Sequence, residues 1–166
     1  MSCSQSTKKG FTLVELLIVV AIMGVLAAVG VVVYNGFMGN TKENTVKANH
    51  VSIVKFCQSQ AMKCVLGANS VVFKDQNGDN YNYDCFAPPL TISTMGGYAN
   101  ACIYHFEGAG WNNIYEPRHL AVSKGTKCST RTGQTEMDGI SYNSIFVCTK
   151  WGEGKNDTII NTFSVE

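Results

Sequence analysis

Hydrophobic and polar residues divide the chain into two parts. From Leu16 to Tyr34, nineteen consecutive residues carry no charge and, before the final tyrosine, no polar side chain. This run meets the length of about 18 residues expected of a membrane-spanning helix. After Asn35 the sequence is polar on average and rich in Asn, Thr, Ser and Gly. The pattern predicts an apolar helical segment joined to a soluble head.

A second helical pattern continues beyond Tyr34. Mostly apolar residues recur every three or four positions, as on one face of an amphipathic helix: Val46, His50, Val54, Cys57, Ala61 and Val65. Gly67 is a natural helix stop. We therefore expect a helix from Phe11 to about Leu66, and we expect His50 to be a packing residue on its stripe rather than a ligand.

The remainder, residues 70–165, predicts short strands separated by glycine-rich links such as Gly96-Gly97. The candidate strands are Val71–Lys74, Ala101–Phe106, Leu120–Ser123, Ile140–Cys148 and Thr158–Val165.

Charge and motifs narrow the function classes. The formal net charge of +1 argues against a strongly basic nucleic-acid-binding protein. One basic run between Pro117 and Thr135 is interpreted as a solvated surface, with contact to DNA or to a partner as the alternative; it contains Arg118, Lys124, Lys127 and Arg131. The chain has no Gly-x-Ser-x-Gly, phosphate-loop or His-Glu-x-x-His motif, so we do not expect an enzyme.

Seven cysteines indicate the compartment. Six of them lie in the head, and none belongs to a Cys-x-x-Cys pair: Cys57, Cys64, Cys85, Cys102, Cys128 and Cys148. An even number in a small head predicts disulfides and an oxidising compartment, with buried free thiols as the alternative. On a continuous helix Cys57 and Cys64 would lie about 10.5 Å apart, too far to pair. Either both reach other cysteines, or the helix breaks between them.

The sequence contains one weak candidate for a metal-binding motif. In the stretch DQNGDNYNYD, residues 75–84, the alternating Asp75, Asn77 and Asp79 resemble a calcium loop with Asp84 within reach. However, Gly78 stands in the wrong place for an EF-hand, and no glutamate closes the loop. Asn77-Gly78 fits a hairpin turn equally well. We expect no other cofactor.

The N-terminal stretch is the most specific motif in the sequence. Lys8 and Lys9 precede the apolar run, which is too long for the core of an ordinary secretory signal and contains Glu15. The stretch KGFTLVELLIVVAIMGVLAAV resembles the N-terminus of type IV pilins and of type II secretion pseudopilins. One departure is Val32, which stands where many type IV pilins have a proline.

The resemblance implies how the chain is processed and organised. A prepilin peptidase would cut between Gly10 and Phe11, and Phe11 would then be N-methylated. The chain would comprise a leader (1–10), a transmembrane and filament-core helix (11–39), the amphipathic half of that helix (40–67) and a globular β head (68–166). The implied fold class is α+β: a long helix packed on an antiparallel sheet of about four strands, stapled by disulfides.

The resemblance also favours a Cys128–Cys148 bond that closes a C-terminal loop. Cys85–Cys102 is then plausible by proximity, which leaves Cys57–Cys64 and requires a break in the helix. Among the 15 connectivities open to six cysteines, the sequence does not choose further.

Glu15 has a role in this interpretation. A carboxylate at the centre of a spanning helix costs about 2.5–3.5 kcal/mol and usually has a partner. Cleavage would supply one, the amine of Phe11, which is spaced i, i+4 from Glu15 on the same chain. We expect the better-matched partner to be the Phe11 amine of a neighbouring subunit, so that the pair sets the register of assembly.

We therefore expect a structural subunit of a type IV pilus. The precursor would lie in the bacterial inner membrane, and the pilus assembly machinery would polymerise it into a homo-oligomeric, extracellular helical filament for adhesion, motility or DNA uptake. Two alternatives remain: a pseudopilin of a periplasmic type II secretion filament, and a membrane-anchored binding module that never polymerises.

Overall fold

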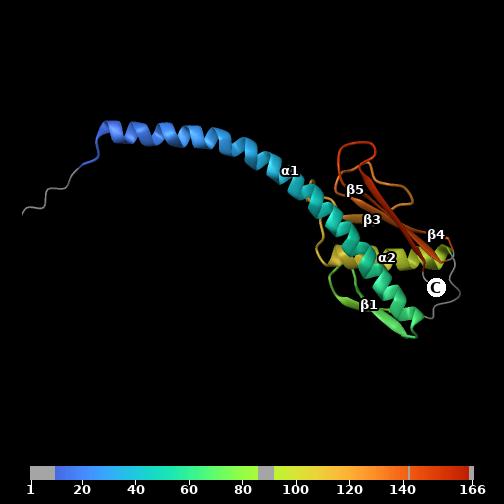
Figure 1. Ribbon diagram of the computed structural model, residues 1–166. Helices are drawn as coiled ribbons and strands as arrows, with labels where there is room; N and C mark the ends of the chain where they lie inside the picture. Colours follow the sequence, from blue (N-terminus) through green and yellow to red (C-terminus); the bar gives the residue numbers. More distant parts are fainter. Residues whose placement is uncertain (1–9, 86–91, 142, 165–166) are drawn as a thin grey trace, which may run out of the picture. The chain divides into compact units, whose positions relative to one another are not determined.

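The computed structural model describes residues 10–85, 92–141 and 143–164 (Figure 1). The expected leader up to residue 9 and the end of the last candidate strand, Val165, lie outside these ranges. The chain forms two compact units, 1–40 and 41–166, which are described separately.

Helix α1, Leu13–Val65, contributes to both units and confirms the predicted long helix. It ends in a Schellman motif. Gly67 has a φ of 93°, its N–H donates to the carbonyl oxygen of Cys64, and the N–H of Ala68 donates to that of Lys63. The left-handed conformation that this motif requires suits glycine and explains why the helix stops there.

In the unit 41–166, α1 buries one face against the head. The buried residues are Val46, His50, Ile53, Val54, Cys57, Gln60 and Ala61. The predicted stripe is therefore confirmed as far as Ala61. Val65 is 47 % exposed, because it lies in the last turn of the helix, next to the exposed Leu66.

The strands among the described residues form two sheets. Strands β1 (Ser70–Lys74) and β2 (Asn80–Asp84) make an antiparallel hairpin. The second sheet has the order β3-β4-β5-β6, with bounds Val122–Lys124, Thr135–Ser141, Ser144–Lys150 and Thr158–Ser164. The β3–β4 pair is parallel and the other two are antiparallel. The α+β class with a disulfide-bonded head is confirmed.

One predicted strand is wrong. Ala101–Phe106 lies in helix α2, Ile92–Gly108. Apolar residues recur along α2 at helical spacing and are buried: Met95, Tyr98, Ala99, Cys102, Ile103 and Phe106. A short apolar run does not separate a buried helix from a strand, and the run continues in both directions at a helical period. The candidate Ile140–Cys148 also divides, between the end of β4 and most of β5.

The core of the head lies where α2 meets α1, the β1–β2 hairpin and the larger sheet. Phe73 of β1, Ile53 of α1, Met95 of α2 and Met137 of β4 are almost completely buried there. Phe73 packs edge-on against Tyr98 and Tyr83, with ring centroids 5.7 and 5.9 Å apart. The head thus builds its own core from four different elements.

Two disulfides staple the head, and they correct the expected pairing. Cys128–Cys148 is present as favoured, but Cys64 bonds to Cys85. Cys57–Cys64 and Cys85–Cys102 are therefore wrong. The helix does not break between Cys57 and Cys64, so these residues stay too far apart to pair. Cys85 lies just after β2, where its N–H donates to Asn69 beside the end of α1. Cys57 and Cys102 are buried free thiols in this structure.

Candidate functional site

The first turn of α1 is built around Glu15. Its Oε2 accepts hydrogen bonds from the backbone N–H and the hydroxyl of Thr12, both at 2.9 Å. The N–H of Glu15 donates in return to the Thr12 hydroxyl at 3.3 Å. Thr12-Leu13-Val14-Glu15 is therefore a capping box, in which two side chains satisfy backbone donors that a helix start leaves unpaired. A carboxylate in the first turn also suits the positive end of the helix dipole.

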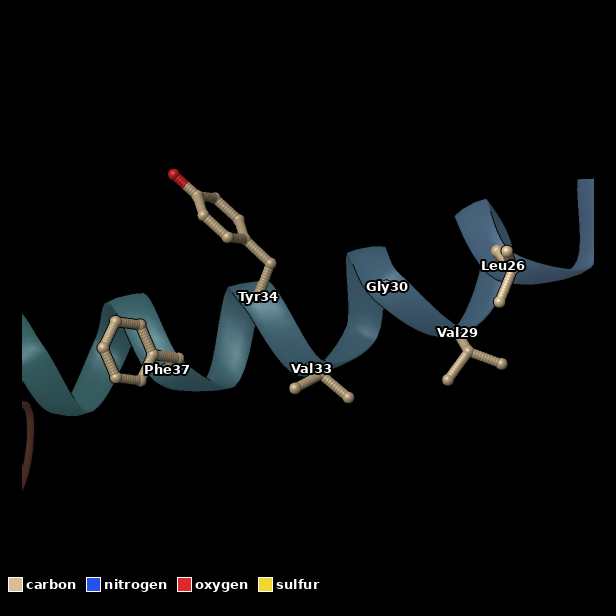
Figure 2. A pocket seen from close by; sticks show the side chains of 6 residues that line it. All are labelled: Leu26, Val29, Gly30, Val33, Tyr34 and Phe37. Carbon is tan, nitrogen blue, oxygen red and sulfur yellow. The ribbon is translucent and has the colours of Figure 1, made fainter. Parts of the chain in front are cut away.

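The helix that follows this cap presents an apolar surface. Every large hydrophobic side chain between Leu13 and Phe37 is at least 45 % exposed within the chain. Six residues from three successive turns line a shallow apolar hollow, shown in Figure 2: Leu26, Val29, Gly30, Val33, Tyr34 and Phe37. Among the described residues, α1 is the one helix that is long and apolar enough to cross a membrane, a criterion of length and composition that a signal sequence also meets.

The expected processing residues lie at the start of this surface. Gly10 and Phe11 are exposed and precede the helix, and Phe11 is 91 % exposed. Within the chain, Thr12 holds the carboxylate of Glu15. Cleavage at Gly10, methylation of Phe11 and a contact between subunits remain predictions.

The structure does not bring the four residues of the expected calcium loop together around one point. Oδ1 of Asp75 accepts the N–H groups of Asn77 and Asp79, at 2.9 and 3.0 Å, and Gly78 has a φ of 90°. These residues form the turn of the β1–β2 hairpin, as in the alternative interpretation. Asp84 pairs with Ser70 at the far end of the hairpin, four residues beyond Asn80, or about 13 Å. Among the described residues, no group of three or more His, Cys, Asp or Glu side chains could hold a metal ion.

The sequence did not reveal the partners of His50. Its Nδ1 lies 2.7 Å from the hydroxyl of Thr149, and its Nε2 lies 2.6 Å from Oδ1 of Asn161. The Thr149 hydroxyl lies 2.6 Å from that of Thr135. If Nε2 carries the proton and donates to Asn161, Nδ1 can accept from the Thr149 hydroxyl. A neutral imidazole therefore satisfies every hydrogen-bonding group in this series of side chains. His50 therefore links α1 to β5 and β6. These contacts agree with the expectation that His50 is a packing residue rather than a ligand.

The basic run is partly neutralised by nearby acids. Arg131 makes an ion pair with Glu116 at 3.0 Å, and Lys124 lies 4.0 Å from a carboxylate oxygen of Asp138. Arg131 also donates to Gln134. These contacts agree with a solvated surface and do not point to DNA.

Comparisons with known proteins matched one family model and several relatives. A family model described as the prokaryotic N-terminal methylation motif matches residues 5–31. The type IV major pilin protein PilA of Myxococcus xanthus is 35 % identical over 78 residues, which are 45 % of this chain and 36 % of PilA. The type IV major fimbrial protein FimA of Dichelobacter nodosus is 53 % identical over 38 residues, 23 % of this chain and 24 % of FimA. No solved structure matches.

The N-terminal part of the chain combines the prokaryotic N-terminal methylation motif with a capped helix whose apolar surface is exposed. Together with the pilin matches, these features show that this chain is similar in part to type IV major pilins. The matched segments span about a third of PilA and a quarter of FimA.

Proposed function

We propose that this protein is a structural subunit of a type IV pilus that polymerises through α1. The observation that carries the proposal is the apolar surface from Leu13 to Phe37, which the chain itself leaves exposed behind a capped carboxylate. Water does not stabilise such a surface, since each large apolar side chain gains about 1.5–3 kcal/mol on burial. A membrane can cover it before assembly, and identical helices can cover it afterwards.

The same proposal accounts for the start of the chain. A prepilin peptidase removes residues 1–10 at the cytoplasmic face of the inner membrane and exposes the amine of Phe11, which is then methylated. The methylation motif over residues 5–31 supports this step. The cut matters for assembly because it creates a cation four residues before Glu15, at the end of the helix that carries the apolar surface.

Glu15 would then exchange partners. In the separate subunit, the donors of Thr12 stabilise its carboxylate. In the filament, the Phe11 amine of a neighbouring subunit takes over part of this role, inside a core of packed apolar helices. An unpaired charge in such a core is penalised heavily, so a helix docked out of register leaves two charges unmatched. The pair therefore selects the register more than it adds affinity.

The test is a substitution at this carboxylate. Glu15→Gln keeps the shape and the acceptor for Thr12 but removes the charge, so the variant should insert in the membrane at normal levels and lose at least about tenfold in sheared fibre, the order expected for one charge pair. Glu153→Gln is the matched control, since Glu153 is an exposed acid in the head. Fibre yield from Glu15→Gln equal to that of Glu153→Gln would refute the register role.

The location of the fibres separates the alternatives. Fibres sheared from the cell surface support a pilus, whereas fibres confined to the periplasm support a secretion pseudopilus. A protein that stays monomeric in the membrane, although it is cleaved after Gly10, would support an anchored binding module.

A further inference from the structure

Two free thiols from different helices are buried in the core of the head. Cys57 of α1 and Cys102 of α2 are both 0 % exposed. Both belong to the same cluster of buried residues. Tyr98, one turn before Cys102, donates its hydroxyl to the backbone carbonyl oxygen of Cys57 at 2.6 Å. This hydrogen bond links α2 to α1, and the two helices cross in Figure 1.

The surroundings of Cys57 and Cys102 favour oxidation of the two thiols to a disulfide over the binding of a metal ion. The other four cysteines of the head form disulfides, so the head matures where disulfides are made. Among the described residues, no third His, Cys, Asp or Glu joins this pair to form a metal site. The Tyr98 hydrogen bond already joins the two helices beside this pair, and a disulfide requires the Cα atoms of Cys57 and Cys102 to lie within about 7 Å of each other.

We propose that Cys57 and Cys102 form a third disulfide, which ties α1 to α2 in the mature protein. The oxidant is a protein disulfide of the dithiol–disulfide exchange class. One cysteine thiolate attacks that disulfide, forms a mixed disulfide and releases one thiol of the oxidant. The second cysteine then displaces the other. The pilin loses two protons and two electrons, and the oxidant becomes a dithiol.

The order of folding and oxidation follows from the burial of the pair. Burial raises the pKa of the Cys57 thiol, and the neighbouring thiol of Cys102 raises it further. Because the thiolate is the reacting species, exchange is slow once α2 has closed over α1. The bond therefore forms during folding, before α2 closes over α1.

The new bond would enclose an existing one. Cys64 and Cys85 lie between Cys57 and Cys102 in the chain, so the two disulfides would be nested and both would fasten α1 to the head. If α1 is the element that packs into a filament, both bonds lie on the path by which a pulling force on α1 reaches the head.

The experiment counts thiols in the full chain after export to an oxidising periplasm. Protein in detergent is denatured without reductant in iodoacetamide, digested and analysed by mass spectrometry. We expect a peptide pair joined through Cys57 and Cys102, two hydrogens lighter than the reduced pair, with neither cysteine alkylated. The Cys64–Cys85 peptide pair is the internal standard for complete oxidation. Alkylation of both Cys57 and Cys102 beside an intact Cys64–Cys85 bond would overturn the proposal, as would a bond from either to another cysteine.

Variants give a second measurement. In Cys57→Ala, alkylation of Cys102 should rise from a trace to nearly complete, whereas alkylation of Cys64 should stay unchanged. If the variant does not accumulate, wild-type protein refolded with and without oxidised glutathione decides instead. The linked peptide should appear only with the oxidant, and its absence in both samples would contradict the third bond.

Discussion

Glu15 and His50 are two polar side chains in apolar surroundings, and local sequence predicts only one of them fully. Glu15 is recognisable because it interrupts an apolar run and stands three residues after Thr12, a spacing that a capping box requires. His50 gives no such signal. Its partners, Thr149 and Asn161, lie about a hundred residues away and meet it only after the sheet has formed.

His50 should make stability depend on pH. Burial lowers its pKa, although the Asn161 hydrogen bond opposes the shift. The unfolded chain therefore binds a proton more readily, so stability is present above the ordinary histidine pKa of about 6.5 and is lost as the pH falls below it. The measurement is a urea titration of the protein in detergent, followed by tryptophan fluorescence. The urea concentration at the midpoint of unfolding should decrease when the pH is lowered from about 7.5 to about 5.5.

The control for this effect is His50→Gln, which keeps a donor and an acceptor but does not titrate. It should lose less stability than the wild type over the same range. Part of the dependence should remain, because burial and the charge of Lys74 also lower the pKa of His105. A wild type and a variant with the same pH slope would show that His50 does not contribute.

The two helices show what periodicity can predict. Helix α1 was predicted because its pattern extends over many turns and ends at Gly67. Helix α2 was missed because its apolar face was interpreted in a six-residue piece and because Gly96-Gly97 resembled a link. The two glycines are tolerated inside α2 because tertiary contacts override helix propensity. A Cβ on Gly96 would lie 3.5 Å from Asp138, and the Cβ position of Gly139 lies 2.7 Å from the backbone of Gly96 and Met95.

The end of α2 offers a test at a different glycine. A Cβ on Gly108 would lie 1.8 Å from the backbone carbonyl oxygen of Asp75, so α2 and the hairpin turn must separate to accept it. Gly108→Ala should destabilise the head by about 3 kcal/mol or more, the upper range for overpacking. The measurement is the free energy of unfolding in urea.

Gly97→Ala is the matched control on the same helix. Its Cβ would meet only the hydroxyl of Tyr83, at 3.9 Å, which is an ordinary contact. Replacing a helical glycine by alanine should stabilise the protein by about 0.5–1 kcal/mol. Equal effects of the two substitutions would contradict the close approach of α2 to the β1–β2 turn.

For the molecule as a whole, the sequence predicts the class of fold and the presence of disulfides better than their pairing. The helix, the soluble head and the Cys128–Cys148 loop were expected. Cys64–Cys85 was not, because the route of the hairpin back to the end of α1 depends on how Phe73 and its neighbours pack. The N-terminal segment was predicted best because its constraints are local in sequence.

The Cys128–Cys148 bond should contribute measurably to the stability of the head. It spans 20 residues, and a loop of that size stabilises by about 3 kcal/mol in the chain-entropy account. The double substitution Cys128→Ala and Cys148→Ala should lower the free energy of unfolding by about that amount, measured in urea without reductant. A reductant should then have a smaller effect on the variant than on the wild type, and an undiminished effect would argue against this bond.

Mass spectrometry of the N-terminus of fibres sheared from cells tests the central claim most directly. The account predicts subunits that begin at Phe11 and carry one methyl group on its amine, with Glu15 unmodified. Fibres whose subunits begin at Met1 would contradict it, because no amine would then lie beside Glu15 to complete the pair.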